Sequence, residues 1–168
     1  TSETPTQSPF YNKLNVNIRS SYEQKQMSDT TDVPVDTTTK DGQQVSIRYS
    51  LRYSLDPQKL LWIAQNIGTQ EQVSARIVHT ESRSVVRNIA REFPASELYA
   101  GDVFSYQQKV GDTLRGAFAE NGVILDEFLV RQIEFSPVYM QAVEQKQIEQ
   151  EKVKTEEFKA QQEEFIKQ

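Results

Sequence analysis

The sequence has no cysteine, only one histidine and no long apolar run. Without cysteine the chain has no disulfide, no thiol nucleophile and no thiolate metal site, which excludes thiol-based redox chemistry. With His79 alone, a metal site built from several histidines is excluded as well. No apolar stretch approaches the roughly 20 residues that span a bilayer, and the N-terminus lacks the basic and apolar regions of a signal peptide. We therefore expect this stretch of chain to be soluble.

The chain also has fewer basic than acidic side chains. The chain has 19 Lys and Arg against 24 Asp and Glu, a net charge of -5, which disfavours a broad attraction to nucleic-acid phosphates, so no nucleic acid is expected as a partner. Its 168 residues suffice for one domain of roughly 120 to 135 residues and an extension. Because the chain begins with Thr1 and not Met, we expect a processed form or a piece of a longer protein with a membrane anchor upstream.

Groups that carry chemistry are few and scattered. Asp126 and Glu127 are neighbours in a predicted strand, so their carboxylates point to opposite faces and cannot share a substrate. Ser82, Ser84 and Ser105 have no histidine at the spacing of a known nucleophile motif. The six glycines are dispersed and form no phosphate-binding loop. We predict a protein that is not an enzyme and that holds neither cofactor nor metal.

The first part of the chain is dominated by strand patterns. Residues 1–9, rich in Ser, Thr and Pro, are predicted to form a disordered lead-in, and the domain is predicted to span residues 10–136. Apolar and polar residues alternate over residues 14–19, and a short edge strand is predicted around Pro34. After a glycine turn, every second residue of 44–53 is apolar, which predicts the clearest strand of the chain.

Helical spacing takes over after Asp56-Pro57, a favoured pair for a helix start. A short helix is predicted up to Gly68, and a longer one over residues 70–93 that ends before Pro94. The longer helix is predicted to bury an apolar stripe. Its members are Val73, Ile77, Val85, Ile89 and Phe93.

The second half repeats the change from helix to strand and back to helix. A single turn at residues 96–99 precedes a helix over residues 105–121. The last strand, residues 123–135, alternates with a slip near residue 126 that indicates a bulge. Ser136-Pro137 then starts a helix rich in Glu, Gln and Lys over residues 137–168. This order predicts an α+β domain followed by the start of an extended C-terminal helix.

Five motifs occur in a characteristic order: KDGQQV at 40–45, YSLDP at 53–57, SEL at 96–98, GVILDEFLVRQIEFSP at 122–137 and AVEQKQ at 142–147. Together they resemble the SPFH, or band 7, domain of stomatins, prohibitins, flotillins and the HflK/HflC pair, and most closely that of prohibitins. The resemblance covers about residues 10–150. The chain departs from it at Asp102, where prohibitin-like chains usually have Arg, and over residues 146–153, where they have an alanine-bearing run.

The resemblance implies a mostly antiparallel sheet with packed helices, in a membrane-anchored scaffold. Proteins of this kind join through their domains and coiled-coil helices into large rings or cages, organise a membrane microdomain and regulate FtsH-type AAA membrane proteases. The implied partners are a second copy or a related SPFH subunit, such a protease, and membrane lipid through an anchor absent from this stretch. The alternative is an adaptor, a monomer or small oligomer, that binds a membrane partner through its C-terminal helix.

The C-terminal helix carries isolated apolar residues that we predict to contact neighbours. They are Val143, Ile148, Val153, Phe158 and Phe165. A spacing of five residues spirals around a helix and does not keep the a/d seam of a two-stranded coiled coil. A helix packed between neighbours suits this pattern, and a solvated single helix held by pairs such as Glu149 with Lys152 is the alternative.

Four arginines recur along the longer predicted helix at spacings of seven, four and four, which would align them on one face. They are Arg76, Arg83, Arg87 and Arg91. One hypothesis is that this stripe contacts the acidic helix of an adjacent subunit, and the alternative is local pairing with Glu81 and Glu92. Trp62 is interpreted as a core residue, with a membrane or partner contact as the alternative.

Overall fold

The structure is a computed structural model that describes residues 26–31 and 33–167. The predicted lead-in at residues 1–9 and the predicted strand at residues 14–19 lie outside the described residues. The chain divides into two compact units, Thr1–Glu134 and Phe135–Gln168. The first unit combines a sheet with packed helices, which confirms the predicted α+β class.

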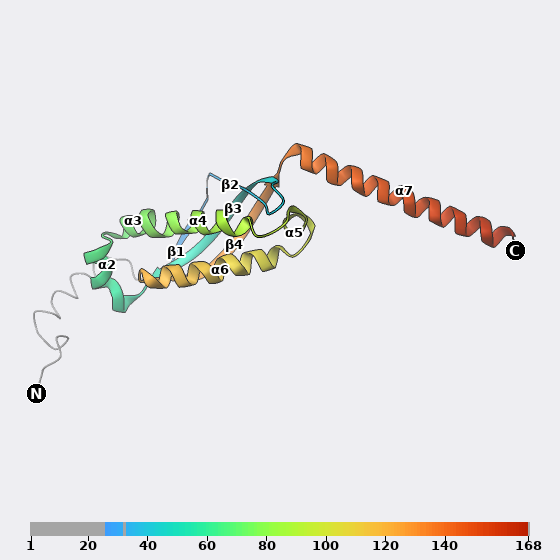
Figure 1. The fold of residues 1–168 in the computed structure, drawn as a ribbon. Helices are drawn as coiled ribbons and strands as arrows, with labels where there is room; N and C mark the ends of the chain where they lie inside the picture. Colours follow the sequence, from blue (N-terminus) through green and yellow to red (C-terminus); the bar gives the residue numbers. More distant parts are fainter. Residues whose placement is uncertain (1–25, 32, 168) are drawn as a thin grey trace, which may run out of the picture. The chain divides into compact units, whose positions relative to one another are not determined.

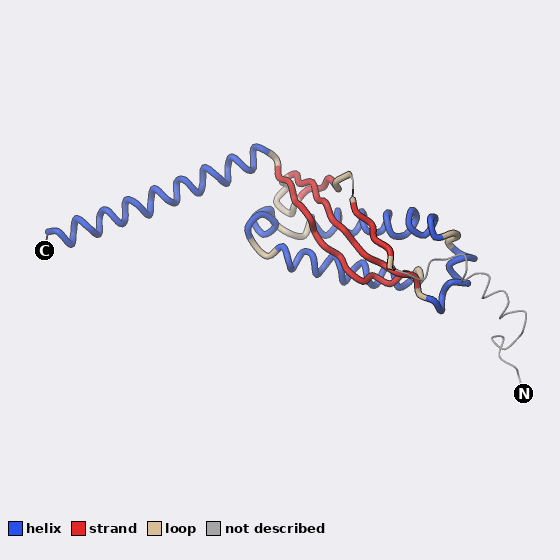
Figure 2. The backbone as a smooth tube through the Cα atoms, turned by 180° about the vertical axis from the view of Figure 1, so that it is seen from behind, coloured by secondary structure: helices blue, strands red, loops and turns tan. Residues whose placement is uncertain are grey.

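A four-stranded sheet forms the first unit's framework, with β3 (Gln44–Leu55) at its centre. Along one edge of β3, β1 (Met27–Thr30) and β2 (Val35–Thr38) pair with it one after the other, both antiparallel. Along the other edge, β4 (Val123–Phe135) pairs with β3 (Figure 2). The predicted alternation in β3 is confirmed, since one face is buried throughout. Its buried residues are Val45, Ile47, Tyr49, Leu51, Tyr53 and Leu55.

The outer strand is interrupted between β1 and β2. Thr30 pairs with Ser50 and Val35 pairs with Ile47, so five steps along the outer strand face three steps along β3. Thr31 bridges the interruption, because its backbone N–H donates to the Tyr49 carbonyl at 3.1 Å and its hydroxyl accepts from the Tyr49 N–H at 2.9 Å. Extra residues of this kind break the regular ladder that an edge strand would otherwise present.

Helices cover the buried face of this sheet (Figures 1 and 2). They are the 3₁₀ turn η2 (Pro57–Lys59), α2 (Leu60–Asn66), α3 (Gln70–Val73), the π-helical turn η3 (Ser74–His79), α4 (Thr80–Ala90), α5 (Ala95–Ala100) and α6 (Val103–Glu120). α4 packs on β2 and on α6. α6 in turn lies over β4, where a Cβ built on Gly111 would stand 3.9 Å from the Cβ of Phe128.

The π-helical turn corrects the predicted helix over residues 70–93. Its i→i+5 geometry inserts one residue, so the buried positions step by five from Val73 to Val78 and then by four to Ser82, Val86 and Ala90. The prediction that Ile77, Val85 and Phe93 are buried is therefore wrong, and all three are half-buried. Ile89 is buried as predicted.

The shift in alternation predicted for β4 is confirmed by the pattern of its buried residues. Val123 and Leu125 are buried, and the next buried residue is Phe128, three positions on. The N–H of Val130 leaves the regular pattern and donates to the Gln107 side chain of α6 at 2.9 Å. The preceding turn needs glycine, because Gly122 has a φ of +74° and a Cβ there would meet Ile63 at 2.8 Å.

The second unit is the helix α7 (Pro137–Lys167) with its short lead-in. The Ser136 hydroxyl accepts from the Tyr139 N–H at 3.2 Å, which caps the helix, and the Phe135 ring stacks on Tyr139 at 5.2 Å. No helix among the described residues is both long and apolar enough to cross a membrane.

Candidate interaction surfaces

α7 has no buried residue over its 31 positions. Of the five apolar residues predicted as contacts, Val143 is half-buried, and the other four are exposed. The largest exposure is near the end of the helix, where Phe158 is 60% exposed and both Phe165 and Ile166 are 81% exposed. These three side chains gather with Gln161 and Gln162 along one stretch of surface. An isolated helix gains little from folding alone, and α7 buries none of its residues within this chain.

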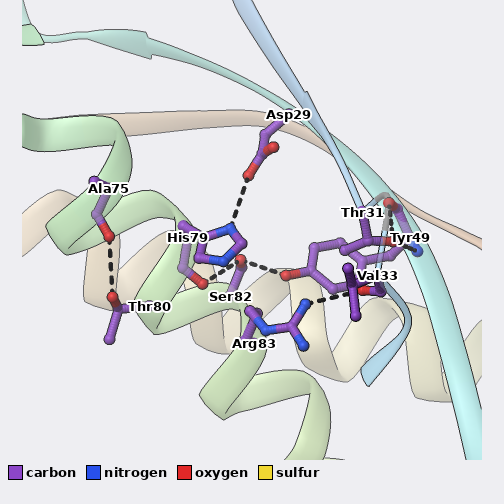
Figure 3. A network of polar contacts seen from close by, with 9 residues as sticks. All are labelled: Asp29, Thr31, Val33, Tyr49, Ala75, His79, Thr80, Ser82 and Arg83. Atoms are coloured by element: carbon purple, nitrogen blue, oxygen red, sulfur yellow. Dashed lines mark hydrogen bonds and ion pairs between the residues drawn. The ribbon is translucent and has the colours of Figure 1, made fainter. Parts of the chain in front are cut away.

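The arginine stripe is divided by the π-helical turn. Arg76 lies within this turn, and its guanidinium donates to the Ile67 carbonyl at 3.0 Å. Beyond the turn, Arg83 reaches the interruption of the outer strand and donates to the Val33 carbonyl at 3.0 Å (Figure 3) and to the Pro34 carbonyl at 3.5 Å. These two arginines therefore tie elements of their own domain together.

Arg87 and Arg91 are different. Both are exposed, and within the described residues neither side chain has an ion pair or a hydrogen bond. Glu92, one of the local carboxylates weighed as a partner, pairs with Lys109 of α6. The structure thus separates the stripe into two arginines that bond to their own domain and two whose side chains have no partner in the described part of the chain.

A network of polar groups joins the sheet to the π-helical turn (Figure 3). The Tyr49 and Ser82 hydroxyls lie 2.6 Å apart in the core, and the Ser82 hydroxyl donates to the His79 carbonyl at 3.2 Å. Burial raises the pKa of Tyr49, with the Ser82 hydrogen bond acting in the opposite direction. At the surface, His79 Nδ1 lies 3.9 Å from the Asp29 carboxylate of β1.

Serine, histidine and aspartate therefore meet here, but not as a catalytic triad. The Ser82 hydroxyl contacts the backbone carbonyl of His79 and not its imidazole, and Ser82 is fully buried. A nucleophile must reach a substrate and be activated by a base within hydrogen-bond distance. This arrangement meets neither condition, so its role is to hold the helical layer to the sheet.

The carboxylates considered in the sequence analysis do not form a shared site among the described residues either. Glu127 pairs with Arg52, and its neighbour Asp126 is exposed. Glu97 is exposed on α5. Across residues 26–31 and 33–167, no group of three or more acidic or histidine side chains is placed to hold a metal ion.

The interpretation of Trp62 as a core residue is wrong, because 42% of its surface is exposed, while Leu60 and Ile63 of the same helix are buried. Leu60 and Ile63 thus anchor α2 in the core, and the Trp62 indole lies at the surface. Sequence reasoning also missed four exposed apolar side chains of the domain. They are Val33, Phe104, Ile124 and Leu129. For Ile124 the signal was the alternation itself, since it lies between the buried Val123 and Leu125.

The motifs that carry the family resemblance have structural roles. The Asp41 carboxylate accepts hydrogen bonds from the Thr39 hydroxyl and, at 3.0 Å, from the Ala95 N–H that opens α5. These two bonds hold the pKa of Asp41 below its usual value. Asp56 caps the helix that follows it, accepting from the Gln58 N–H at 3.0 Å. The Asp102 carboxylate caps α6 through Ser105.

The family comparison agrees with this geometry. The family described as "SPFH domain / Band 7 family" matches residues 7–164. Similar proteins include Prohibitin-1 of Saccharomyces cerevisiae, 30% identical over 135 residues, which are 78% of this chain and 46% of that protein. Prohibitin-1 of Colletotrichum higginsianum is 30% identical over 130 residues, 76% of this chain and 46% of its own.

A third relative is the "Mitochondrial prohibitin complex protein 1" of Caenorhabditis elegans, 29% identical over 115 residues, 68% of this chain and 40% of that protein. The chain thus spans less than half the length of each of these relatives. The match to the family covers both the domain and nearly all of α7. The chain belongs to the SPFH domain / Band 7 family and is similar to prohibitins.

Proposed function

We propose that this protein is a non-enzymatic, membrane-associated scaffold that assembles into large rings or cages. The observation that carries the proposal is α7, a helix of 31 residues without a buried side chain, joined to a well-packed domain of the SPFH family. Water is a poor environment for exposed Phe158 and Phe165, so neighbouring subunits are the natural cover for them. The polar chemistry of the described residues serves capping and packing, which fits a scaffold better than a catalyst.

In the assembly, α7 supplies contacts to its neighbours through its apolar residues. They are Val143, Ile148, Val153, Phe158 and Phe165. The arginine stripe, above all Arg87 and Arg91, supplies a second contact on the domain, with Arg76 and Arg83 holding the surface behind it. The partner is another copy of this chain or a related SPFH subunit, in line with the relative named as a mitochondrial prohibitin complex protein.

The scaffold is proposed to act at a membrane, held there by an anchor outside this stretch. Its proposed role is to organise a membrane microdomain and to regulate an FtsH-type membrane protease enclosed by the ring. Both parts come from the family relationship.

The scaffold proposal is tested by measuring the mass of the particles in solution. Light scattering over a wide concentration range should compare this chain with a version that carries an upstream membrane anchor in nanodiscs. Large closed particles in the anchored form are the expected result, and removal of residues 141–168 should abolish them while the domain stays folded. Monomers or dimers in every form would overturn the scaffold.

A second candidate, an adaptor that binds a membrane partner through α7, is favoured by the scattered apolar residues of that helix. It predicts a small particle with or without the anchor, and a folded monomer that loses partner binding when residues 141–168 are removed. The same experiment therefore separates the two candidates.

A further inference from the structure

The two edges of the domain carry opposite charge. One is the α4 edge, where α4 packs on β2, and its surface includes Arg83, Arg87 and Arg91. Its acidic residues are Glu81, Asp36, which accepts a hydrogen bond from Ser46, and Glu92, which pairs with Lys109. Of the three arginines, Arg83 is fixed by backbone carbonyls of the outer strand, and the other two are exposed without an ion pair in the described part of the chain. The α4 edge is therefore a preorganised basic surface.

The opposite side is the β4 edge, where α6 lies over β4. Between residues 112 and 134 it has five acidic side chains and two arginines. One aspartate pairs with Arg115 and one glutamate with Arg52. Glu120 and Asp126 are exposed and have no ion pair among residues 26–31 and 33–167. The β4 edge is therefore an acidic surface.

Each edge also exposes apolar surface beside its charges. On the α4 edge, Val33 is 67% exposed, and its carbonyl is held by Arg83. On the β4 edge, Ile124 and Leu129 are 44% and 43% exposed. An apolar contact flanked by complementary charges is the usual composition of a protein interface. β1 with β2 on one side and β4 on the other are also the outermost strands of the described sheet (Figure 2).

We propose that the α4 edge of one copy binds the β4 edge of the next, with Arg87 and Arg91 facing Glu120 and Asp126. The contact joins two different surfaces, so it is head-to-tail, and repetition closes a ring when the rotation between copies allows it. This inference rests on the proposed scaffold and specifies which surfaces its domains use. It assigns α7 no part in the contact.

The absence of cysteine makes cross-linking a clean test. Ser84 is exposed on α4, and Gly116 is exposed on α6 with open space around it, four residues before Glu120. In the anchored form in nanodiscs, a chain with both Ser84→Cys and Gly116→Cys should give a ladder of dimers, trimers and larger species on mild oxidation. Either substitution alone should give only monomer, because a head-to-tail contact never brings two identical positions together.

A second test combines this cross-linking with charge reversal. In the two-cysteine chain, Arg87→Glu with Arg91→Glu should reduce trimers and larger species about tenfold or more, because like charges would then face each other. Glu120→Arg with Asp126→Arg should do the same, and all four changes in one chain should restore the ladder. Glu97→Arg, a reversal of one exposed charge on α5, is the matched control and should leave the ladder unchanged.

Three results would overturn the inference: dimers from a single-cysteine chain, which indicate a contact between identical surfaces; a ladder that ignores the reversals; or no cross-link although light scattering shows large particles. In each of these cases the proposed scaffold can still stand, because particle mass tests it separately. Small particles in the anchored form would remove the scaffold itself.

Discussion

The domain and α7 use similar side chains in opposite ways. Phe118 of α6 is fully buried, whereas Phe158 of α7 is 60% exposed. The domain satisfies its polar groups internally, and no buried side-chain N or O atom of the described residues lacks a hydrogen-bond partner. α7 has an N-cap and short-range contacts along its own turns. The domain is thus stabilised by burial within one chain, whereas α7 has no comparable burial of its own.

The largest expected effect tests this difference with the same substitution in both regions. Phe118→Ala should lower the free energy of unfolding of the domain by about 3–5 kcal/mol, since it empties a buried aromatic site. Phe158→Ala should change it by less than about 0.5 kcal/mol, because surface substitutions far from the core have small effects. Urea denaturation monitored by circular dichroism measures both. Equal losses for the two variants would contradict the independence of the two regions.

The next largest effect on stability is expected at the buried hydroxyl pair of Tyr49 and Ser82. Ser82→Ala leaves the Tyr49 hydroxyl without its partner in the core and should cost about 1–3 kcal/mol. Tyr49→Phe should cost less, because the Ser82 hydroxyl keeps its bond to the His79 carbonyl. Urea denaturation of both single variants and the double variant gives a coupling energy. A coupling near zero would mean that the 2.6 Å contact contributes nothing to stability.

The lowered pKa of Asp41 predicts that the free energy of unfolding of the domain depends on pH. Hydrogen bonds from Thr39 and the Ala95 N–H lower its pKa in the folded state, so its contribution is present above the unfolded pKa near 3.9 and is lost as pH falls through the folded pKa. Asp41→Ala should cost about 1 kcal/mol at pH 7, as loss of a helix cap does, and less at pH 3. Asp41→Asn, which keeps one acceptor oxygen, should retain most of the stability without the pH dependence. A cost for Asp41→Ala that stays constant from pH 7 to pH 3 would refute this assignment.

The smallest effects concern helix propensity. Gly116 is exposed within α6 with nothing close to a built Cβ, so Gly116→Ala should stabilise the domain by about 0.5–1 kcal/mol. Gln150→Gly in α7 should reduce the far-ultraviolet helical signal without moving the unfolding transition of the domain. A shift of the domain's midpoint by Gln150→Gly would show that the two regions unfold together.

Elements with simple periodicity were predictable from the sequence. The burial of β3, the start at Asp56-Pro57 and the slip in β4 follow from alternation and capping, which are local properties. The π-helical turn was not predictable, because Val73, Ile77, Val85 and Ile89 also fit the spacing of a regular α-helix. Nor were the bonds of Arg76 and Arg83, whose acceptor carbonyls belong to other elements. The opposite charges of the two edges needed the strand order, which the sequence does not state.

The joint between β4 and α7 has a mechanical consequence. Only Ser136 stands between the last residue of the strand and the first of the helix. Tension applied to α7 therefore enters the domain through β4 without a slack linker, and it is resisted by the ladder that pairs β4 with the central strand. A pull on the helix is thus transmitted directly into the sheet.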